Sequence, residues 1–150
     1  MASCPAHRTC PTVCVRQAGM QVTPLGDVAH ASRRSIHKAI HPGGVESCQL
    51  VMGFTALEEG SIWNTMPPHT HVRRSEIYLY LGLEDGMVVH LAGTPQATRS
   101  LIVRDREAVL SPSWSVHTGA GTRAYRFVWV MAGENQDFDD MQGAPIATLA

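Results

Sequence analysis

The sequence reads PPHTHVRRSE over residues 67–76, and this stretch indicates both the fold of the chain and its chemistry. Side chains alternate along a β-strand, so His69 and His71 point to the same face if the segment is extended. Glu76 has the opposite parity, so we expect a turn or a β-bulge over residues 72–75. A strand that begins at Glu76 then directs its carboxylate back toward the two imidazoles.

A second stretch reads PSWSVH over residues 112–117 and supplies a third imidazole, that of His117. Three neutral imidazoles and one carboxylate suit borderline divalent ions such as Zn²⁺, Fe²⁺, Mn²⁺ or Ni²⁺. An ion that can expand its coordination also keeps room for a substrate oxygen. We therefore expect one divalent ion per chain, zinc before the others, with the ligands His69, His71, Glu76 and His117.

Short segments with strand character, separated by glycine- and proline-rich turns, make up most of the chain. No window shows a sustained helical period. We expect strands over residues 35–40, 47–55, 61–65, 76–82, 87–92, 100–103, 108–111 and 124–131. Residues 83–86, which read LEDG, are expected to form a hairpin loop, and residues 119–122 a second tight connection. This pattern favours an all-β sandwich or a small barrel.

The chain has 150 residues, the usual size of one domain. Residues 1–31 are rich in Pro, Gly, Thr and Cys, so we expect an extended N-terminal arm or junction there and a β domain over residues 32–150. Cys4, His7, Cys10 and Cys14 lie in this arm and could form a zinc site, but they lack paired Cys-x-x-Cys spacing, which favours reduced thiols.

The formal net charge of −1 gives no reason to expect a nucleic-acid or membrane partner. No apolar run approaches the roughly 20 residues that a membrane-spanning helix needs, and the N-terminus lacks the apolar core of a signal peptide. We expect a cytoplasmic protein that binds a small molecule. The chain also lacks a phosphate-binding glycine loop, which disfavours sugar phosphates as substrates.

Three residues are candidates for a catalytic role. Parity places Tyr78 and Tyr80 on the same strand face as Glu76, so either phenol could donate a hydrogen bond to a substrate oxygen, although both could equally be core residues. Glu134, an acid after the last expected strand, is the third candidate. His90 is expected to be a buried core histidine with its hydrogen bonds satisfied.

The pattern of histidine, glutamate and glycine resembles the two cupin motifs. The residues in the motif positions are Gly60, His69, His71, Glu76 and Gly82 for the first motif, and Pro112 and His117 for the second. Two departures are a long gap between Gly60 and His69 and Trp114 in place of the usual glycine.

Within the cupins, the chain is most similar to the family of 5-dehydro-4-deoxy-D-glucuronate isomerases, also called 4-deoxy-L-threo-5-hexosulose-uronate ketol-isomerases. The matching blocks lie at residues 48–53, 63–71, 111–117 and 131–135, and WNTMPPHTH over residues 63–71 is the most specific. The likeness covers the C-terminal half of the family's longer chain. The block over residues 93–100 departs from the family at Ala97 and Ser100.

This resemblance implies a cupin-type double-stranded β-helix, or jelly-roll barrel, in which His69, His71, Glu76 and His117 hold the metal. It implies a metal-dependent aldose–ketose isomerase that converts 5-dehydro-4-deoxy-D-glucuronate to 3-deoxy-D-glycero-2,5-hexodiulosonate in the breakdown of pectin or other polyuronides. A uronate needs a cation for its carboxylate, and Arg99 and Arg73 are the candidates. The alternatives are an iron-dependent cupin dioxygenase and a non-catalytic sugar-binding cupin.

The family's members assemble as oligomers, so we also expect a homo-oligomer. Parity directs Ile77, Leu79 and Leu81 away from Glu76, and Val88 is expected on the adjoining strand. An apolar face of this kind, left open to water, favours self-association.

Overall fold

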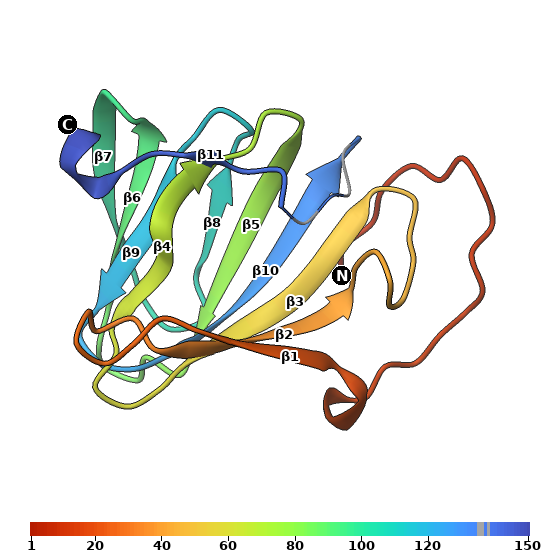
Figure 1. Cartoon of the computed structure of the whole chain (residues 1–150), viewed down its shortest axis with the longest axis horizontal. Coiled ribbons are helices and arrows are strands. Elements are labelled where there is room, and N and C mark those ends of the chain that lie inside the picture. The colour runs from red at the N-terminus through yellow and green to blue at the C-terminus, as the bar shows by residue number, and fades with distance from the viewer. Residues whose placement is uncertain (135–136, 138) are drawn as a thin grey trace.

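The computed structural model describes residues 1–134, 137 and 139–150 (Figure 1). Within these residues the chain forms strands and two short 3₁₀ turns, η1 (Gln17–Gly19) and η2 (Ile146–Thr148). The strands are β1 (Gln21–Leu25), β2 (Arg34–Ile40), β3 (Leu50–Leu57), β4 (Trp63–Thr70), β5 (Arg74–Leu81), β6 (Val88–Thr94), β7 (Ala97–Val103), β8 (Ala108–Ser111), β9 (His117–Gly121), β10 (Arg126–Gly133) and β11 (Gln142–Gly143).

The strands form two antiparallel sheets that face each other (Figure 1). One sheet has six strands in the order β1-β2-β3-β10-β5-β8, and the other has five in the order β11-β4-β9-β6-β7. The chain passes from one sheet to the other between β3 and β4, between β4 and β5, and between β5 and β6. This arrangement confirms the all-β, cupin-type barrel expected from the sequence.

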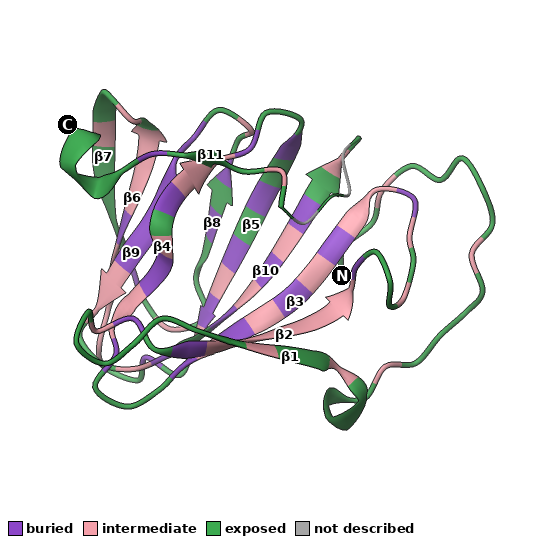
Figure 2. Cartoon of the chain, in the orientation of Figure 1, coloured by how far each residue is buried: buried purple, intermediate pink, exposed green. Residues whose placement is uncertain are grey.

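Buried and exposed residues alternate along the strands, as they do when one face of a sheet covers a core. In β5 buried residues alternate first with exposed and then with partly buried ones, and in β3 they alternate with partly buried ones (Figure 2). In β5, Glu76, Tyr78 and Tyr80 are buried, while Ser75 and Ile77 are exposed. The parity expected for this strand is therefore confirmed.

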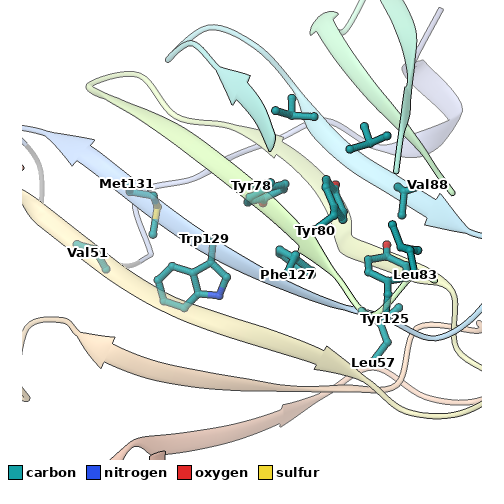
Figure 3. Packing of buried hydrophobic residues seen from close by; sticks show 12 residues of the cluster. Val51, Leu57, Tyr78, Tyr80, Leu83, Val88, Tyr125, Phe127, Trp129 and Met131 are labelled. Atoms are coloured by element: carbon teal, nitrogen blue, oxygen red, sulfur yellow. The ribbon is translucent and has the colours of Figure 1, made fainter. Parts of the chain in front are cut away.

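Aromatic side chains from β5 and β10 dominate the core between the sheets. Tyr78 and Tyr80 pack around Phe127, with ring centroids 4.9 and 5.9 Å from that of Phe127 (Figure 3). Trp129 lies farther along β10, where Nε1 donates a hydrogen bond to Thr55 Oγ1 at 3.1 Å. Burying a large aromatic side chain of this kind contributes roughly 1.5–3 kcal/mol.

Two connections differ from the sequence-based expectation. Residues 83–86 form a turn, but it links β5 to β6 in the opposite sheet and is not a hairpin loop. Residues 119–121 belong to β9, which pairs with both β4 and β6, so they do not form a tight connection. The glycines in this strand are explained by close packing, since a Cβ on Gly119 would lie 3.0 Å from a side-chain carbon of Val88.

The crossing between β5 and β6 also corrects the expected position of Val88. Val88 is fully buried between the sheets and does not extend an outer patch with Ile77. Of the other residues in that expected patch, Ile77 is exposed, whereas Leu79 and Leu81 are partly buried.

The N-terminal segment is largely exposed up to residue 20 (Figure 2). Beyond it, Gln21–Leu25 joins the six-stranded sheet as β1, paired with β2 over residues 34–38. The division into an arm over residues 1–31 and a domain over residues 32–150 remains a prediction. Among the described residues, no helix has the length and apolar character that crossing a membrane requires.

Candidate metal centre

Four side chains converge between the two sheets. His69 lies near the end of β4, His71 directly follows this strand, Glu76 is in β5, and His117 is the first residue of β9. Their possible ligand atoms, one from each side chain, all lie within 4.8 Å of one another. The structure therefore brings together the four residues that the sequence analysis selected.

The strand pairings explain how residues far apart in sequence meet. His69 is the register partner of His117 in the β4–β9 pair. The chain then turns at Val72 and Arg73 and enters β5 in the other sheet, so Glu76 approaches the imidazoles from across the barrel. The sequence predicts a turn or a β-bulge over residues 72–75, and in the structure the chain changes sheet there.

Each imidazole is oriented by an oxygen next to its Nδ1 atom. The main-chain oxygen of Pro67 lies 3.1 Å from His69 Nδ1, and that of Asp140 lies 2.8 Å from His71 Nδ1. His117 Nδ1 lies 3.3 Å from the main-chain oxygen of Ser115. A carbonyl oxygen only accepts hydrogen bonds, so these contacts hold the proton on Nδ1 and leave Nε2 with a free lone pair.

The freed nitrogens face the carboxylate of Glu76. Glu76 Oε2 lies 3.2 Å from His71 Nε2 and 3.0 Å from His117 Nε2. Two unprotonated nitrogens and a carboxylate oxygen at these distances repel one another unless a proton or a metal ion lies between them. The donor set and its orientation therefore fit a divalent ion held by His69, His71, Glu76 and His117.

Burial and mutual proximity set the protonation of these groups. Burial, together with the nearby His117, lowers the pKa of His69 to about 3, so this ring is neutral at neutral pH. Burial by itself raises the pKa of Glu76, but His117 and His71 outweigh it and leave that pKa below its usual value. A neutral imidazole and an ionised carboxylate are the forms that bind metals.

A buried arginine holds the C-terminal segment beside His71. The guanidinium of Arg74 donates hydrogen bonds to the main-chain oxygens of Asp137, at 2.5 Å, and Asp140, at 3.2 Å. Because Asp140 also orients His71, Arg74 supports the position of that ring. Asn135, which falls within one of the sequence blocks quoted above, lies outside the described residues.

The cluster opens into a cavity of about 340 Å³ between the sheets. His69, His71 and Glu76 line one part of it, and the rest of the lining is largely apolar. The other lining residues are Leu25, Arg34, Ile36, Thr55, Thr65, Met66, Pro67, Tyr78, Phe127, Trp129, Met131, Met141 and Gly143. A cavity of this size, with a few polar groups on a largely apolar wall, is typical of a site for a small molecule.

The three catalytic candidates occupy different places. Tyr78 lines the cavity, and its hydroxyl lies 3.0 Å from Thr65 Oγ1. Tyr80 is not a lining residue, and its hydroxyl lies 2.7 Å from His90 Nδ1 and 3.2 Å from Asn64 Nδ2. Glu134 is exposed after the end of β10. Only Tyr78 is thus placed to touch a molecule in the cavity.

His90 is buried in the core, as expected, but only one of its nitrogens has a partner. Nδ1 contacts Tyr80, whereas Nε2 has none among the described residues. Burial, with a contribution from His117, lowers the pKa of His90 to about 3, so the ring is neutral.

The two arginines proposed for the carboxylate lie outside the cavity lining. Arg99 is exposed on the edge strand β7, and Arg73 is exposed in the turn between β4 and β5. The cation that does line the cavity is Arg34, which the sequence analysis did not select. The sequence predicts a strand from residue 35, whereas β2 begins one residue earlier, so that Arg34 shares a strand face with Ile36.

The N-terminal Cys and His residues form no second ligand cluster among the described residues. All four cysteines are free thiols, of which Cys48 is buried.

The fold and the cluster together define a class of protein: a cupin-type barrel with a three-histidine, one-glutamate site beside an internal cavity. Residues 1–145 match the model of the KduI/IolB family, and the chain belongs to this family.

Curated relatives carry the name 4-deoxy-L-threo-5-hexosulose-uronate ketol-isomerase. The relative from Opitutus terrae is 62% identical over 148 residues, which are 98% of this chain and 53% of the relative. The one from Kineococcus radiotolerans is 58% identical with the same coverage. The one from Salmonella typhimurium is 51% identical over 146 residues, or 97% of this chain and 52% of the relative. The chain spans about half the length of the curated relatives it matches.

Solved structures support the fold. An IolB-like protein from Salmonella typhimurium superposes with a TM-score of 0.69 at 16% identity, over 84% of this chain and 51% of that protein. Pac13, a nucleoside dehydratase from Streptomyces, superposes with a TM-score of 0.63 at 11% identity, over 90% of this chain and 92% of that protein. At such identities the likeness concerns the barrel alone.

Proposed function

We propose that this chain is a divalent-metal-dependent ketol-isomerase of the uronate 4-deoxy-L-threo-5-hexosulose-uronate, also called 5-dehydro-4-deoxy-D-glucuronate. The observation that supports this most is the cluster of His69, His71, Glu76 and His117, the first three of which line a cavity of about 340 Å³. The curated relatives carry the name of this activity, and the chain is 62% identical to one of them. Zinc is the ion we expect at the site.

The proposed reaction moves hydrogen between neighbouring carbons and needs no oxidant. The C2–H bond breaks, a C1–H bond forms, and the C2 hydroxyl proton is transferred to the C1 oxygen, which gives 3-deoxy-D-glycero-2,5-hexodiulosonate. Negative charge develops on the C1 and C2 oxygens in between. A divalent ion, when bound, supplies Lewis-acid stabilisation of that charge.

Side chains that line the cavity supply a hydrogen-bond donor and an apolar environment for this hydrogen transfer. Burial and the nearby Glu76 raise the pKa of Tyr78 well above its usual value, so the phenol keeps its proton and can donate a hydrogen bond to a substrate oxygen. Thr65 Oγ1, at 3.0 Å, orients the phenol. The apolar lining of Phe127, Trp129 and Met131 excludes water, which strengthens every electrostatic contact inside.

An isomerase assay beside metal analysis tests the proposal. We expect turnover of the ketouronate, no turnover of phosphorylated sugars, and about one divalent ion per chain. Tyr78→Phe should lower kcat roughly 100-fold without changing the metal content. Tyr80→Phe is the matched control, since Tyr80 lies on the same strand face but outside the cavity lining, and its kcat should stay close to that of the unmodified chain.

Two other functions predict different results. An iron-dependent dioxygenase would consume oxygen when loaded with Fe²⁺, and a sugar-binding protein would bind the ketouronate without converting it. Absence of isomerisation by the metal-loaded chain, together with either result, would replace the proposal.

A homo-oligomer and a cytoplasmic location remain parts of the same proposal. The first is supported by exposed apolar side chains on two neighbouring edge strands, Leu101 and Ile102 on β7 and Leu110 on β8.

A further inference from the structure

Arg34 is a buried cation on the wall of the cavity. It is the first residue of β2, and its exposed fraction is 6%. Nη1 donates a hydrogen bond to the main-chain oxygen of Ser32 at 2.7 Å, and Nη2 donates one to that of Met66 at 2.8 Å. These contacts fix the plane of the guanidinium and still leave other N–H groups of its five available.

No carboxylate among the described residues forms an ion pair with Arg34. The neighbouring Arg33 shows the ordinary arrangement, because it is exposed and its Nε lies 2.9 Å from Glu58 Oε2. The hydrogen-bond acceptors of Arg34 within the described part of the chain are, by contrast, neutral carbonyl oxygens. A buried guanidinium stays charged but loses much of its hydration, so an anion that enters the cavity gains an unusually strong partner.

Arg34 contacts β4 of the opposite sheet, the strand that also carries His69. The guanidinium reaches across the barrel to Met66, three residues before His69 in β4, and three extended residues span at most roughly 11 Å. The cavity thus has the guanidinium of Arg34 near Met66 of β4 and the metal-binding cluster near His69 of the same strand. Apolar side chains, among them Ile36, Phe127 and Trp129, form much of its remaining wall.

We propose that Arg34 binds the carboxylate of the substrate and thereby selects a uronate over a neutral sugar. This inference rests on the proposed function. In an open-chain ketouronate the C6 carboxylate and the C1–C2 pair that reacts lie at opposite ends of a six-carbon chain. With the carboxylate on Arg34, the reacting end extends toward His69, His71 and Glu76. Arg73 and Arg99, both exposed and outside the lining, are not required.

Three variants of the metal-loaded chain test this role. Arg34→Gln removes the charge, Arg34→Lys keeps the charge but loses the planar fork, and Arg33→Gln is the matched control one residue away on the exposed side. We expect Arg34→Gln to raise KM for the ketouronate about 100-fold or more, with a smaller change in kcat. Arg34→Lys should raise KM about tenfold, and Arg33→Gln should leave it unchanged.

A neutral analogue separates binding from a merely structural role. In the C6 carboxamide of the same sugar the carboxylate is absent, so Arg34→Gln should change its KM less than threefold while the metal content stays at one ion per chain. Equal losses for the acid and the amide would show that Arg34 only supports the fold and would overturn the proposal. If Arg34→Gln does not fold, the same comparison between acid and amide is made with Arg34→Lys.

A direct measurement of substrate binding tests the role of Arg34 independently of isomerase activity. Trp129 lines the cavity, so tryptophan fluorescence reports occupancy without turnover. If the unmodified chain binds the ketouronate but does not convert it, and Arg34→Gln abolishes binding, the isomerase proposal fails and the role of Arg34 stands. If the chain converts the ketouronate and Arg34→Gln leaves KM unchanged, the isomerase proposal stands and Arg34 is not its carboxylate site.

Discussion

At the scale of single residues, the cluster depends on which nitrogen of each histidine is left free. Main-chain oxygens of Pro67, Asp140 and Ser115 occupy the Nδ1 side of His69, His71 and His117. Because backbone oxygens cannot donate, the tautomer is imposed by the fold. Two of these oxygens, those of Pro67 and Ser115, lie two residues before their histidine in the sequence. The third, that of Asp140, reaches His71 from the C-terminal segment, and no local motif reveals that contact.

The first prediction concerns the loss of a ligand. His117→Ala should lower the affinity for zinc about 100-fold or more, because it removes one of four ligands from a site that cannot recruit a replacement from its apolar surroundings. Elemental analysis after dialysis against a weak chelator measures this. His30→Ala is the control, since His30 is exposed and its Nδ1 is bound to Asp27 at 2.8 Å. Full zinc occupancy in His117→Ala would contradict the assignment.

At the scale of strands, local alternation predicted much of the site. The parity of Glu76, Tyr78 and Tyr80 follows from the period of a strand, and the structure buries all three. The need for a break between His71 and Glu76 also followed from parity, but whether that break is a bulge or a change of sheet depends on pairing across the barrel. Sequence alternation carries no information on such pairing.

Because strand pairing cannot be predicted from alternation, two sequence-based expectations are wrong or incomplete: the position of Val88 and the choice of arginines. The sequence places Val88 next to Ile77 because β5 and β6 are consecutive, yet β5 pairs with β8 and β10 in one sheet and β6 with β7 and β9 in the other. Arginines at strand boundaries are usually solvated, as Arg33 is, so no sequence signal distinguishes Arg34 from its neighbour. Only the fold shows that Arg34 lines the cavity and that Arg33 forms an ion pair with Glu58.

The second prediction concerns the contact between β3 and β10 behind the cavity. Gly53 is the register partner of Trp129, and a Cβ on Gly53 would lie 2.4 Å from the indole ring and 2.1 Å from the main-chain oxygen of His37. Neither distance can be accommodated without moving β2 or Trp129. Gly53→Ala should therefore lower the free energy of unfolding by about 1–3 kcal/mol, as overpacking of a tight site does.

Urea denaturation of the two proteins measures this difference. Gly19→Ala is the control, because a Cβ on Gly19 meets nothing within 4 Å. Since Trp129 also lines the cavity, Gly53→Ala should weaken substrate binding as well. An unchanged urea midpoint would show that the β2–β3 pair is far more adaptable than its geometry indicates.

At the scale of the whole molecule, the two sheets end side by side with apolar side chains exposed. β8 is the last strand of the six-stranded sheet, and β7 is the last strand of the five-stranded one. Residues 101–103 and 107–110 of these strands and their connection line one shallow groove. Leu110, 73% exposed, and Ile102, 54% exposed, lie on it, and Ile77 is the register partner of Leu110.

The third prediction is that this edge mediates self-association. An open strand edge with exposed apolar side chains gains both hydrogen bonds and about 25 cal/mol per Å² of buried apolar surface when a second copy covers it. We expect light scattering to give at least twice the chain mass of 16.3 kDa at high protein concentration. Leu110→Lys should shift the mass toward that of a single chain, because a buried lysine loses its hydration.

Val28→Lys is the control for a change in general solubility, since Val28 is 56% exposed but lies outside the strands. Its mass should equal that of the unmodified chain. All four ligand residues belong to one chain, so Leu110→Lys should still bind zinc even as a monomer. A mass of 16.3 kDa for the unmodified chain at every concentration would exclude this interface, and dissociation by Val28→Lys but not by Leu110→Lys would move it elsewhere.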